Sequence, residues 1–387
     1  MKVVIVGGGV GGVACAQRLA KRASDVQVQL IDRTLRHDFA PSFLWVMIGR
    51  RQAERVSRSL GGLTRKRVEV AEAEVEGLDV DAGVVATSGG EVAFDQLVLA
   101  PGAALAADAI PGLGEAAHGF YTRESAERLR DALADFRGGR VLILVAAMPF
   151  KCPAAPYEAA FLIEDLLRAR GVTARVDIIT AEPQPLPVAG EEIGARVAAM
   201  LAERGIGFAP ARKLESVDAE AHEARFADGS EPYDLLVAVP PHRPPAFVAD
   251  SALAGPSGWI PVDPASLKAA ESVHAVGDVT AIKLPNEMLL PKAGVFAHGQ
   301  AEVVADNLAA QAADRTATAS FDGDGSCFLE TGGGRAGFAS GNFYAEPAPR
   351  VQMRRPARRW HLGKILFERR WLSRLPRRSA ESGEGGR

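Results

Sequence analysis

The N-terminal segment constrains the fold more than any other part of the chain. In "KVVIVGGGVGGVACAQRLAKR" an apolar strand, a glycine turn and a helix follow one another, and Gly7, Gly9 and Gly12 have G-x-G-x-x-G spacing. In that motif the first glycine makes a tight turn, the second lets the backbone approach a pyrophosphate, and the third lets the helix pack closely on the strand. The next strand ends at Asp32 and Arg33, about 20 residues beyond the last glycine, where an acidic residue binds ribose. The sequence therefore predicts an N-terminal Rossmann-like dinucleotide-binding domain.

Two later segments favour FAD over NAD as the dinucleotide. "DQLVLAPGA", residues 95–103, is a buried strand whose small-residue turn holds Ala100 and Gly102, and "SVHAVGDVT", residues 272–280, ends at Gly277 and Asp278. Both resemble further signatures of the flavoproteins that have two dinucleotide-binding domains, in which the aspartate bonds the ribityl chain of FAD. The resemblance implies an α/β fold like that of glutathione reductase, with a small inserted sheet between residues 32 and 100.

The expected domains follow from these motifs. The FAD domain takes residues 1–110 and 250–315, and a second Rossmann-like domain takes residues 111–249. Residues 316–378 are expected to form a C-terminal sheet and an amphipathic helix that associates with a membrane. Residues 379–387, "SAESGEGGR", are expected to form a disordered tail.

The second domain lacks the glycines of a nucleotide loop. Its first strand-to-helix turn reads "VAAMPFKCPAAP", with no glycine between Arg140 and Gly171, and Pro153 and Pro156 lack the backbone N–H groups that a phosphate needs. The following strand ends at Thr180 without an acidic residue for ribose. We expect the Rossmann-like fold without a nicotinamide site, and hence an electron donor other than NAD(P)H.

A cysteine stands in that turn instead. Cys152 lies near a helix N-terminus beside Lys151, two features that favour a thiolate, and Glu158 follows as a candidate proton acceptor. Cys327 lies in a strand flanked by glycine turns. Either cysteine is a redox thiol or a small apolar side chain in the core, whereas Cys15, inside the first helix, is expected to be a packed core thiol.

Four segments together carry a more specific resemblance. "KCPAAPYEAAFLIEDLLR", "HAVGDVTAIKLPNEMLLPKAGVFAHGQAEVVADNLA", "SCFLETGGGRAGFASGNFYAEP" and "WHLGKILFERRWL" resemble the sulfide:quinone oxidoreductases and the related flavoprotein subunit of flavocytochrome c sulfide dehydrogenase. The family implies that sulfide, or a small persulfide, attacks a disulfide or polysulfide bridge between Cys152 and Cys327, with Glu158 as the nearby base. Electrons pass to FAD and then to a membrane quinone. Lys292 is implied near the flavin pyrimidine ring, where a positive charge stabilises reduced flavin.

Two departures define the expected subtype. Some members have a third redox cysteine where this chain has Tyr121, so a two-cysteine subtype is expected. The cytochrome-linked subunits attach FAD through a cysteine. The corresponding region here, "HDFAPSFLWVMIGRR", contains no cysteine. Its absence favours a quinone as the electron acceptor.

The C-terminal helix is basic and amphipathic. Its expected apolar face consists of Trp360, Phe367, Trp371, Leu372 and Leu375, interrupted by Lys364 and Glu368, with Arg359, Arg370 and Arg374 on the other side. This pattern is typical of a membrane-surface helix, although a helix packed on its own protein or on a second subunit is the alternative. Phe343, Tyr344 and Phe367 are candidates for stacking on a quinone.

Composition limits the remaining function classes. A net charge of -3 and three cysteines give no reason to expect nucleic-acid binding or a disulfide scaffold, and no metal site is expected. Because no signal peptide and no apolar run of membrane-spanning length are found, we expect a cytoplasmic protein, peripheral on the inner face of the cell membrane. Oligomeric state stays open, and the competing hypotheses are a type II NADH:quinone oxidoreductase and a non-turnover flavin sensor of sulfur or redox state.

Overall fold

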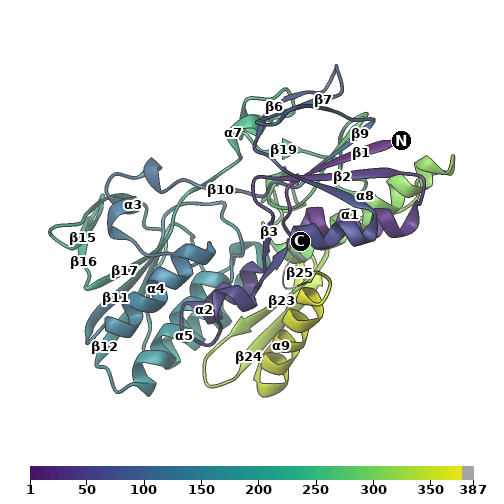
Figure 1. Cartoon of the computed structure of the whole chain (residues 1–387). Coiled ribbons are helices and arrows are strands. Elements are labelled where there is room, and N and C mark those ends of the chain that lie inside the picture. The colour runs from purple at the N-terminus through teal and green to yellow at the C-terminus, as the bar shows by residue number, and fades with distance from the viewer. Residues whose placement is uncertain (377–387) are drawn as a thin grey trace, which may run out of the picture.

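The computed structural model describes residues 1–376 of the chain. The tail expected at residues 379–387 therefore lies outside the described residues. Figure 1 shows two α/β units side by side, with the C-terminal strands and helix α9 below their junction.

The first unit is built on a six-stranded sheet in the order β20-β21-β9-β1-β2-β5. Its strands are β1 (Lys2–Val6), β2 (Gln27–Asp32), β5 (Val68–Glu72), β9 (Gln96–Leu99), β20 (Lys268–Ala270) and β21 (Val273–Ala275). All neighbours are parallel except β20 and β21. The central strands are buried on both faces, as continuous apolar runs such as that of β1 require.

Helices cover one face of this sheet and a small sheet covers the other. Helix α1 (Val10–Arg22) packs along α8 (Gly294–Ala312). The small sheet consists of β6 (Val75–Asp79), β7 (Val84–Thr87) and β8 (Gly90–Ala93). The sequence pattern assigns all the strands between residues 32 and 100 to the inserted sheet. In the structure β5 instead extends the main sheet beside β2, because Val68 is buried in the hydrophobic core of the first unit.

The second unit repeats this plan with a parallel sheet in the order β13-β12-β11-β17. The strands are β11 (Gly139–Val145), β12 (Ala174–Thr180), β13 (Gly207–Ala209) and β17 (Leu235–Val239). They are accompanied by α4 (Arg123–Asp135), α5 (Ala155–Ala169), α6 (Glu191–Glu203) and the antiparallel strands β14 (Leu214–Asp218), β15 (Glu223–Phe226) and β16 (Gly229–Pro232). A capping box of Thr122 and Ser125 starts α4, and Pro156 stands in the first turn of α5, where a missing N–H costs nothing.

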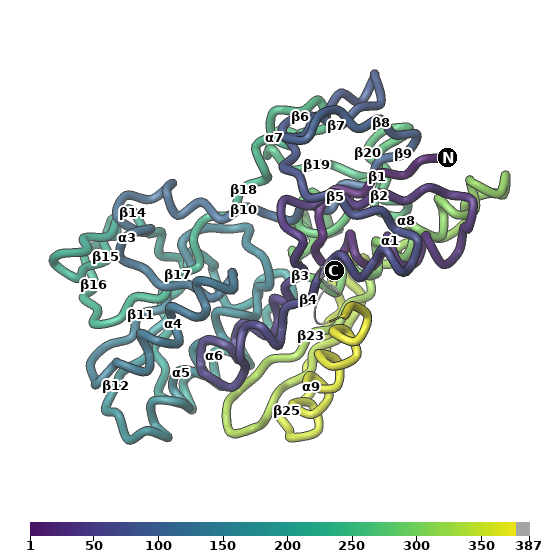
Figure 2. The backbone as a smooth tube through the Cα atoms, viewed as in Figure 1, coloured from purple at the N-terminus to yellow at the C-terminus, as the bar shows by residue number. Residues whose placement is uncertain are grey.

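The C-terminal region joins both units. Strands β23 (Asp324–Glu330), β24 (Ala336–Asn342) and β25 (Arg350–Ala357) form an antiparallel sheet, and α9 (Arg358–Leu372) follows. Strand β23 contacts both α5 and α8. The end of α9 returns to β4 (Ser57–Ser59), as Figure 2 shows. There Arg58 donates to the Leu372 carbonyl at 3.0 Å.

Short elements complete the connections between the units. They are α2 (Phe43–Val46), α3 (Leu113–Ala116), α7 (Ala246–Ala249), β3 (Arg36–Asp38), β4 (Ser57–Ser59), β10 (Ala104–Leu105), β18 (His242–Arg243), β19 (Ile260–Pro261) and β22 (Thr280–Ala281). Strand β10 pairs with β18 where the chain passes from one unit to the other and back.

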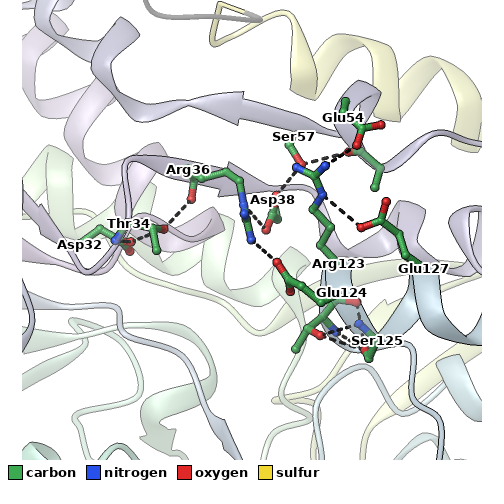
Figure 3. Close-up of polar contacts among 12 residues, drawn as sticks. Asp32, Thr34, Arg36, Asp38, Glu54, Ser57, Arg123, Glu124, Ser125 and Glu127 are labelled. Carbon is green, nitrogen blue, oxygen red and sulfur yellow. Dashed lines mark hydrogen bonds and ion pairs between the residues drawn. The ribbon is translucent and has the colours of Figure 1, made fainter.

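An ionic contact also links the units near the end of β2. Arg36 bridges Asp38 at 2.9 Å and Glu124 of α4 at 2.8 Å, while Arg123 pairs with Glu54 (Figure 3). In each pair at least one side chain is 40% exposed or more, so each pair adds only about 0 to 1 kcal/mol to stability.

Candidate active site

The glycine turn after β1 has the shape that a bound pyrophosphate needs. Gly7 has a φ of +101°, and a Cβ there would lie 2.3 Å from the Ala100 carbonyl oxygen. A Cβ at Gly12 would lie 1.8 Å from the Gly7 carbonyl oxygen, whereas a Cβ at Gly9 would meet open space. Two glycines are thus required by packing, and the open side at Gly9 leaves room for phosphate at the N-terminus of α1.

The acidic residue predicted to bind ribose lies beside this turn. Asp32 ends β2 and accepts hydrogen bonds from Gly8 N at 2.6 Å and Thr34 N at 2.8 Å. Arg33 is exposed next to it, and its charge helps to lower the pKa of Lys151 in the second unit. The end of β2 therefore faces the turn that carries Cys152.

The other expected FAD residues gather at the same edge of the sheet. Gly277 (φ +77°) donates its N–H to Gln300 at 2.7 Å, and its absent side chain makes room for Ala297. Burial raises the pKa of Asp278, against the opposing charges of Lys151 and Lys292. Gly102 has a φ of +74° and follows Ala100 at the end of β9. These residues fit an elongated dinucleotide that runs from the β1–α1 turn to the N-terminus of α8.

Lys292 lies two residues before the start of α8. Its ammonium group donates to the Asp278 carbonyl at 2.6 Å and lies 3.4 Å from the centroid of Trp259. Burial lowers the pKa of Lys292 to about 8. Its carbonyl accepts the Cys152 N–H at 2.6 Å, so the backbone of Lys292 holds the cysteine turn against the FAD-binding unit.

Cys152 adopts a strained backbone conformation in the turn between β11 and α5. Its φ is +51°, in the left-handed region that a non-glycine residue enters only when the surroundings hold it there. The Lys292 carbonyl on one side and the Ala155 N–H, which donates to the Cys152 carbonyl at 2.9 Å, hold this conformation. The turn is thus shaped to present a side chain, and Pro153 contributes no N–H to it.

Cys152 and Cys327 line one cavity of about 310 Å³. Its walls come from the second unit, the N-terminus of α8 and the C-terminal sheet, and they are mostly apolar. Cys327 points into it from β23, and its exposed surface is part of this wall. Both cysteines are free thiols, and Cys15 is fully buried in the α1 core, as expected.

The surroundings of the thiols oppose a thiolate, contrary to the sequence prediction for Cys152. Burial, followed by the charge of Cys327, raises the pKa of Cys152 well above its usual range. Burial also raises the pKa of Cys327 to about 12. The adjacent Lys151 does not offset this effect, because burial lowers its own pKa and its ammonium group faces the Tyr121 ring. A base is therefore needed to take protons from these sulfurs.

Glu158 lies behind the two thiols and is almost completely buried. Its Oε1 atom accepts hydrogen bonds from Lys364 Nζ of α9 at 2.6 Å and from the Glu330 N–H of β23 at 2.8 Å. Burial raises the pKa of Glu158, while Lys364 opposes that rise, and Glu158 in turn raises the pKa of both thiols. Glu158 is thus a buried, paired carboxylate whose charge acts on both sulfurs.

Tyr121 occupies the space behind the cysteine turn. Its hydroxyl donates to the Cys152 carbonyl at 3.5 Å, and the side chain is buried. It supports the turn at the position where some members of the family resembled have a third cysteine.

The aromatic residues proposed for quinone stacking do not lie together. Phe343 lines the cavity and packs edge-on against Phe296 at 5.0 Å. Tyr344 turns away, and its hydroxyl donates to the Pro264 carbonyl. Phe367 is 45% exposed on α9 and reaches the cavity only through Phe328, whose ring centroid is 6.4 Å away. Phe328 was missed in the sequence, where its position beside Cys327 was the available signal.

Glu182 was also missed, and it corrects the prediction that no acidic residue follows β12. It lies two residues beyond Thr180 and lines the cavity. The Tyr157 hydroxyl donates to it at 2.5 Å and the Thr180 hydroxyl at 3.2 Å, so its carboxylate is already engaged. Burial raises its pKa to about 7.

Most of the predicted apolar face of α9 packs on the protein itself, which was the alternative to a membrane-facing helix. Trp371, Leu372 and Leu375 are buried in the core of the FAD-binding unit. Lys364 and Glu368, which interrupted that face, point into the protein, where Lys364 meets Glu158 and Glu368 pairs with Arg51 at 3.0 Å. Buried partners for these two charges allow them to lie on the same inward face as the apolar side chains, as the periodicity placed them. The exposed large apolar side chains of α9 are instead Leu362, Leu366 and Phe367.

The end of α9 reaches the nucleotide turn through one histidine. Trp371 Nε1 donates to His37 Nε2 at 2.8 Å, and His37 Nδ1 lies 2.8 Å from the Gly8 carbonyl oxygen. Because the indole N–H can only donate, the imidazole hydrogen is on Nδ1 and donates to Gly8. Burial lowers the pKa of His37 and keeps it neutral.

Residues 1–376 form neither a membrane-spanning helix nor a metal-binding cluster. None of the helices formed by residues 1–376 combines the length and the apolar character that a membrane span needs. Nor do residues 1–376 bring together enough histidine, cysteine, aspartate or glutamate side chains for a metal site.

Fold and site together define a family. The chain belongs to the pyridine nucleotide-disulphide oxidoreductase family, whose model matches residues 1–301. This confirms the α/β fold with two dinucleotide-binding units and the FAD cofactor that the glycine signatures predicted.

Within that family the chain is similar to sulfide:quinone oxidoreductases. It is 27% identical to the sulfide-quinone reductase of Aquifex aeolicus, over 96% of this chain and 90% of the relative. It is 26% identical to the mitochondrial sulfide:quinone oxidoreductase of Mus musculus, over 89% and 79% of the two chains. The solved structure of the sulfide:quinone oxidoreductase from Aquifex aeolicus superposes with a TM-score of 0.87, at 25% identity, over 96% of this chain and 90% of that one.

Proposed function

We propose that this chain oxidises sulfide at Cys152 and Cys327 and passes the electrons through bound FAD to a quinone. The observation that carries the proposal is the apolar cavity that both thiols share. The cavity lies at the turn of the second unit where a glycine loop would hold a nicotinamide nucleotide. Sulfide therefore takes the place of a nicotinamide hydride as the source of electrons. The substrate is sulfide or a small persulfide.

The chain's own residues bind the cofactor and handle the sulfur. Gly7, Gly9, Gly12 and Asp32 hold the pyrophosphate and ribose of FAD, and the other contacts come from Arg33, Ala100, Gly102, Gly277, Asp278 and Lys292. When bound, FAD accepts two electrons from the thiol pair and gives them to the quinone.

The sulfur step begins with an oxidised bridge between Cys152 and Cys327. The sulfide anion attacks one bridge sulfur, a new S–S bond forms, the old one breaks, and the released cysteine leaves as a thiolate. The other cysteine then carries a persulfide, which still holds the hydrogen. The burial that raises the pKa of both thiols also opposes ionisation of this persulfide, so Glu158 acts as the base that removes its hydrogen.

A quinone reaches the site from a membrane surface on which α9 rests. Leu362 and Leu366 are about two-thirds exposed, at 63% and 66%, on neighbouring turns of α9, next to Phe367. Exposed arginines of the same helix, including Arg359 and Arg370, match the anionic phosphates of a lipid surface. We place the protein on the inner face of the cell membrane, with Phe343 and Phe367 as quinone contacts and Tyr344 as a more distant one.

Stopped-flow absorbance of the flavin tests the proposal. Anaerobic mixing of the FAD-loaded protein with sulfide is expected to bleach the flavin, and subsequent addition of decylubiquinone is expected to restore its colour over many turnovers. Rapid bleaching by NADH in place of sulfide contradicts the proposal. Bleaching by sulfide without reoxidation by quinone indicates a sensor in place of an enzyme.

A further inference from the structure

A line of buried ionisable side chains leads from the thiols to the surface beside α9. It begins at Glu158, whose charge acts on both thiols, and continues to Lys364 at 2.6 Å. Both side chains are at least 94% buried. Burying charged groups costs free energy unless they are paired, so a buried series of this kind has to be explained.

The outer half of the line is formed by Glu330 and His361. The carboxylate of Glu330 is fully buried, and His361 Nδ1 lies 2.9 and 3.0 Å from its two oxygens. The His361 side chain is 18% exposed, with its ring edge against Trp45. His361 is therefore the point at which the line meets solvent.

Lys364 joins the two halves. It lies three residues after His361, so both side chains project from the same side of α9. Although burial lowers the pKa of Lys364, the charges of Glu158 and Glu330 outweigh burial and raise it. Of the carboxylates in residues 1–376, that of Glu158 alone lies within 4 Å of the ammonium group. Glu330 also donates its backbone N–H to Glu158 at 2.8 Å, which fixes the two residues relative to each other.

The sulfur chemistry of the proposed function releases a proton at the inner end of this line. After attack by the sulfide anion, one cysteine is a thiolate and the other a persulfide that carries the hydrogen. Closing the bridge again with one extra sulfur forms one S–S bond and releases two electrons and one proton. The electrons go to FAD and then to quinone, and the proton goes to Glu158. Glu158 must lose that proton before the next turnover.

We propose that Glu330 and His361 form the solvent end of a proton relay that removes the proton from Glu158 through Lys364. The inference rests on the proposed sulfide oxidation. Lys364 Nζ contacts Glu158 but lies more than 4 Å from the Glu330 carboxylate, so its flexible side chain moves to Glu330, gives it one proton, and returns to take the proton of Glu158. Glu330 then passes its proton to His361, which releases it to water. Neither Glu330 nor His361 touches the sulfur, and both act only through Glu158.

Chemical rescue tests the relay. In the FAD-loaded His361→Ala variant, we expect repeated flavin reduction by sulfide to slow about tenfold or more, since proton transfer by a positioned side chain contributes at least that much. Imidazole added to the buffer is expected to fill the exposed space and restore most of the rate in a saturable manner. Glu330→Gln is expected to slow the reaction equally but without rescue, because the carboxylate between His361 and Lys364 is missing.

A second readout follows the trapped proton itself. In His361→Ala treated with sulfide, the infrared difference spectrum is expected to show the carbonyl band of a protonated carboxylic acid, and Glu158→Gln in the same background is expected to remove it. His222→Ala, an exposed histidine that stacks on Tyr233 far from the site, is the matched control and is expected to keep the wild-type rate.

The outcomes separate the relay from the proposed function. If sulfide fails to bleach the wild-type flavin, the proposed function is wrong and the relay with it. If the wild type reacts but His361→Ala reacts at the same rate, the relay alone is overturned. A slow His361→Ala variant with an unchanged melting temperature that imidazole does not rescue also overturns the relay, because the role of His361 is then structural.

Discussion

At the scale of single residues, the reactivity of the site depends on burial more than on local sequence. Lys151 stands beside Cys152, yet the cation that opposes the rise in the thiol pKa is Lys364, which lies 212 positions further along the chain in α9. The base and its cation come from α5 and α9, and the second thiol comes from β23. The site is thus assembled from three segments that no short motif connects.

The two cysteines give the first prediction. Cys152→Ser and Cys327→Ser are each expected to abolish flavin reduction by sulfide while FAD stays bound, because a hydroxyl cannot form the sulfur bridge. Stopped-flow absorbance and the ratio of flavin to protein measure the two effects. Cys15→Ala is the control, since this thiol is packed inside α1 away from the cavity, and it is expected to keep activity. Wild-type rates in either serine variant contradict the pair.

Lys364 gives a prediction about pH. Glu158 acts as a base only when ionised, so the rate of sulfide-dependent flavin reduction rises with pH through its pKa. Lys364→Met removes a cation that lowers this pKa, so the rising limb is expected to move to higher pH. The rate near neutral pH is then expected to fall below that of the wild type. Comparison with the wild type at every pH removes the contribution from sulfide's own ionisation, and coincident profiles would falsify the role of Lys364.

At the scale of elements, α9 has two opposite faces with different tasks. The inner face carries Lys364, Glu368 and Trp371 and packs on the protein, and the outer face carries Leu362, Leu366 and Phe367. Membrane docking and the alternative of packing on the chain itself therefore belong to different faces of one helix.

The outer face predicts how the protein binds lipid. The double variant Leu362→Glu, Leu366→Glu is expected to lose co-sedimentation with anionic vesicles, because it replaces exposed apolar area with negative charge, while its melting temperature stays the same. Leu35→Glu, at another exposed leucine (41%) outside α9, is the control and is expected to sediment like the wild type. Equal sedimentation of the double variant and the control shows that α9 is not the lipid-binding element.

The inner end of α9 predicts a link to cofactor binding. Trp371→Phe leaves His37 Nε2 buried without its donor, at a cost of about 1 to 3 kcal/mol in the free energy of unfolding. Because His37 also holds the Gly8 carbonyl, we expect weaker FAD binding, measured by flavin fluorescence on dilution.

Trp360→Phe is the matched control for that experiment. The indole N–H of Trp360 finds no hydrogen-bond partner within the described residues, and its ring stacks on Phe338 at 4.8 Å. Its loss is expected to leave FAD affinity as it is. The link through His37 is refuted when both tryptophan variants bind FAD equally.

At the scale of the whole molecule, two similar α/β units have different ligands. The first keeps a glycine turn with an open side at Gly9. In the second, the equivalent turn is occupied by Cys152 and closed by the Lys292 backbone, and Glu182 is engaged by Tyr157. In the proposed function one unit binds the dinucleotide, and the other, together with the C-terminal sheet, encloses the sulfur site.

This division predicts the choice of electron donor. NADH at millimolar concentration is expected neither to bleach the flavin on the stopped-flow timescale nor to slow bleaching by sulfide, because the second turn offers no glycine backbone and no free acidic residue to a nucleotide. Absorbance at equal concentrations of NADH and sulfide measures both effects. Competition between the two donors indicates that a nucleotide site persists in the second unit.

The sequence by itself determined the features that depend on local backbone chemistry. The glycines of the first turn, the Asp32 that follows and the glycine-free second turn are contiguous motifs whose geometry is set by neighbouring residues, so the fold class and FAD followed from them and are confirmed. The positions of Cys152 and Cys327 along the chain were equally visible, together with the resemblance to sulfide:quinone oxidoreductases.

Only the tertiary structure decided which side chains meet. The periodicity placed Lys364, Glu368 and Trp371 on one face of α9 but left open whether that face meets a membrane or the protein. The structure packs it on the protein, because Lys364 and Glu368 have partners on α5 and near α2 that a periodic pattern does not contain. For the same reason the pairs of Glu330 with His361 and of His37 with Trp371 were missed. The pKa of each thiol also depended on burial by distant segments. Long-range packing creates these contacts, so they become visible only when the chain is folded.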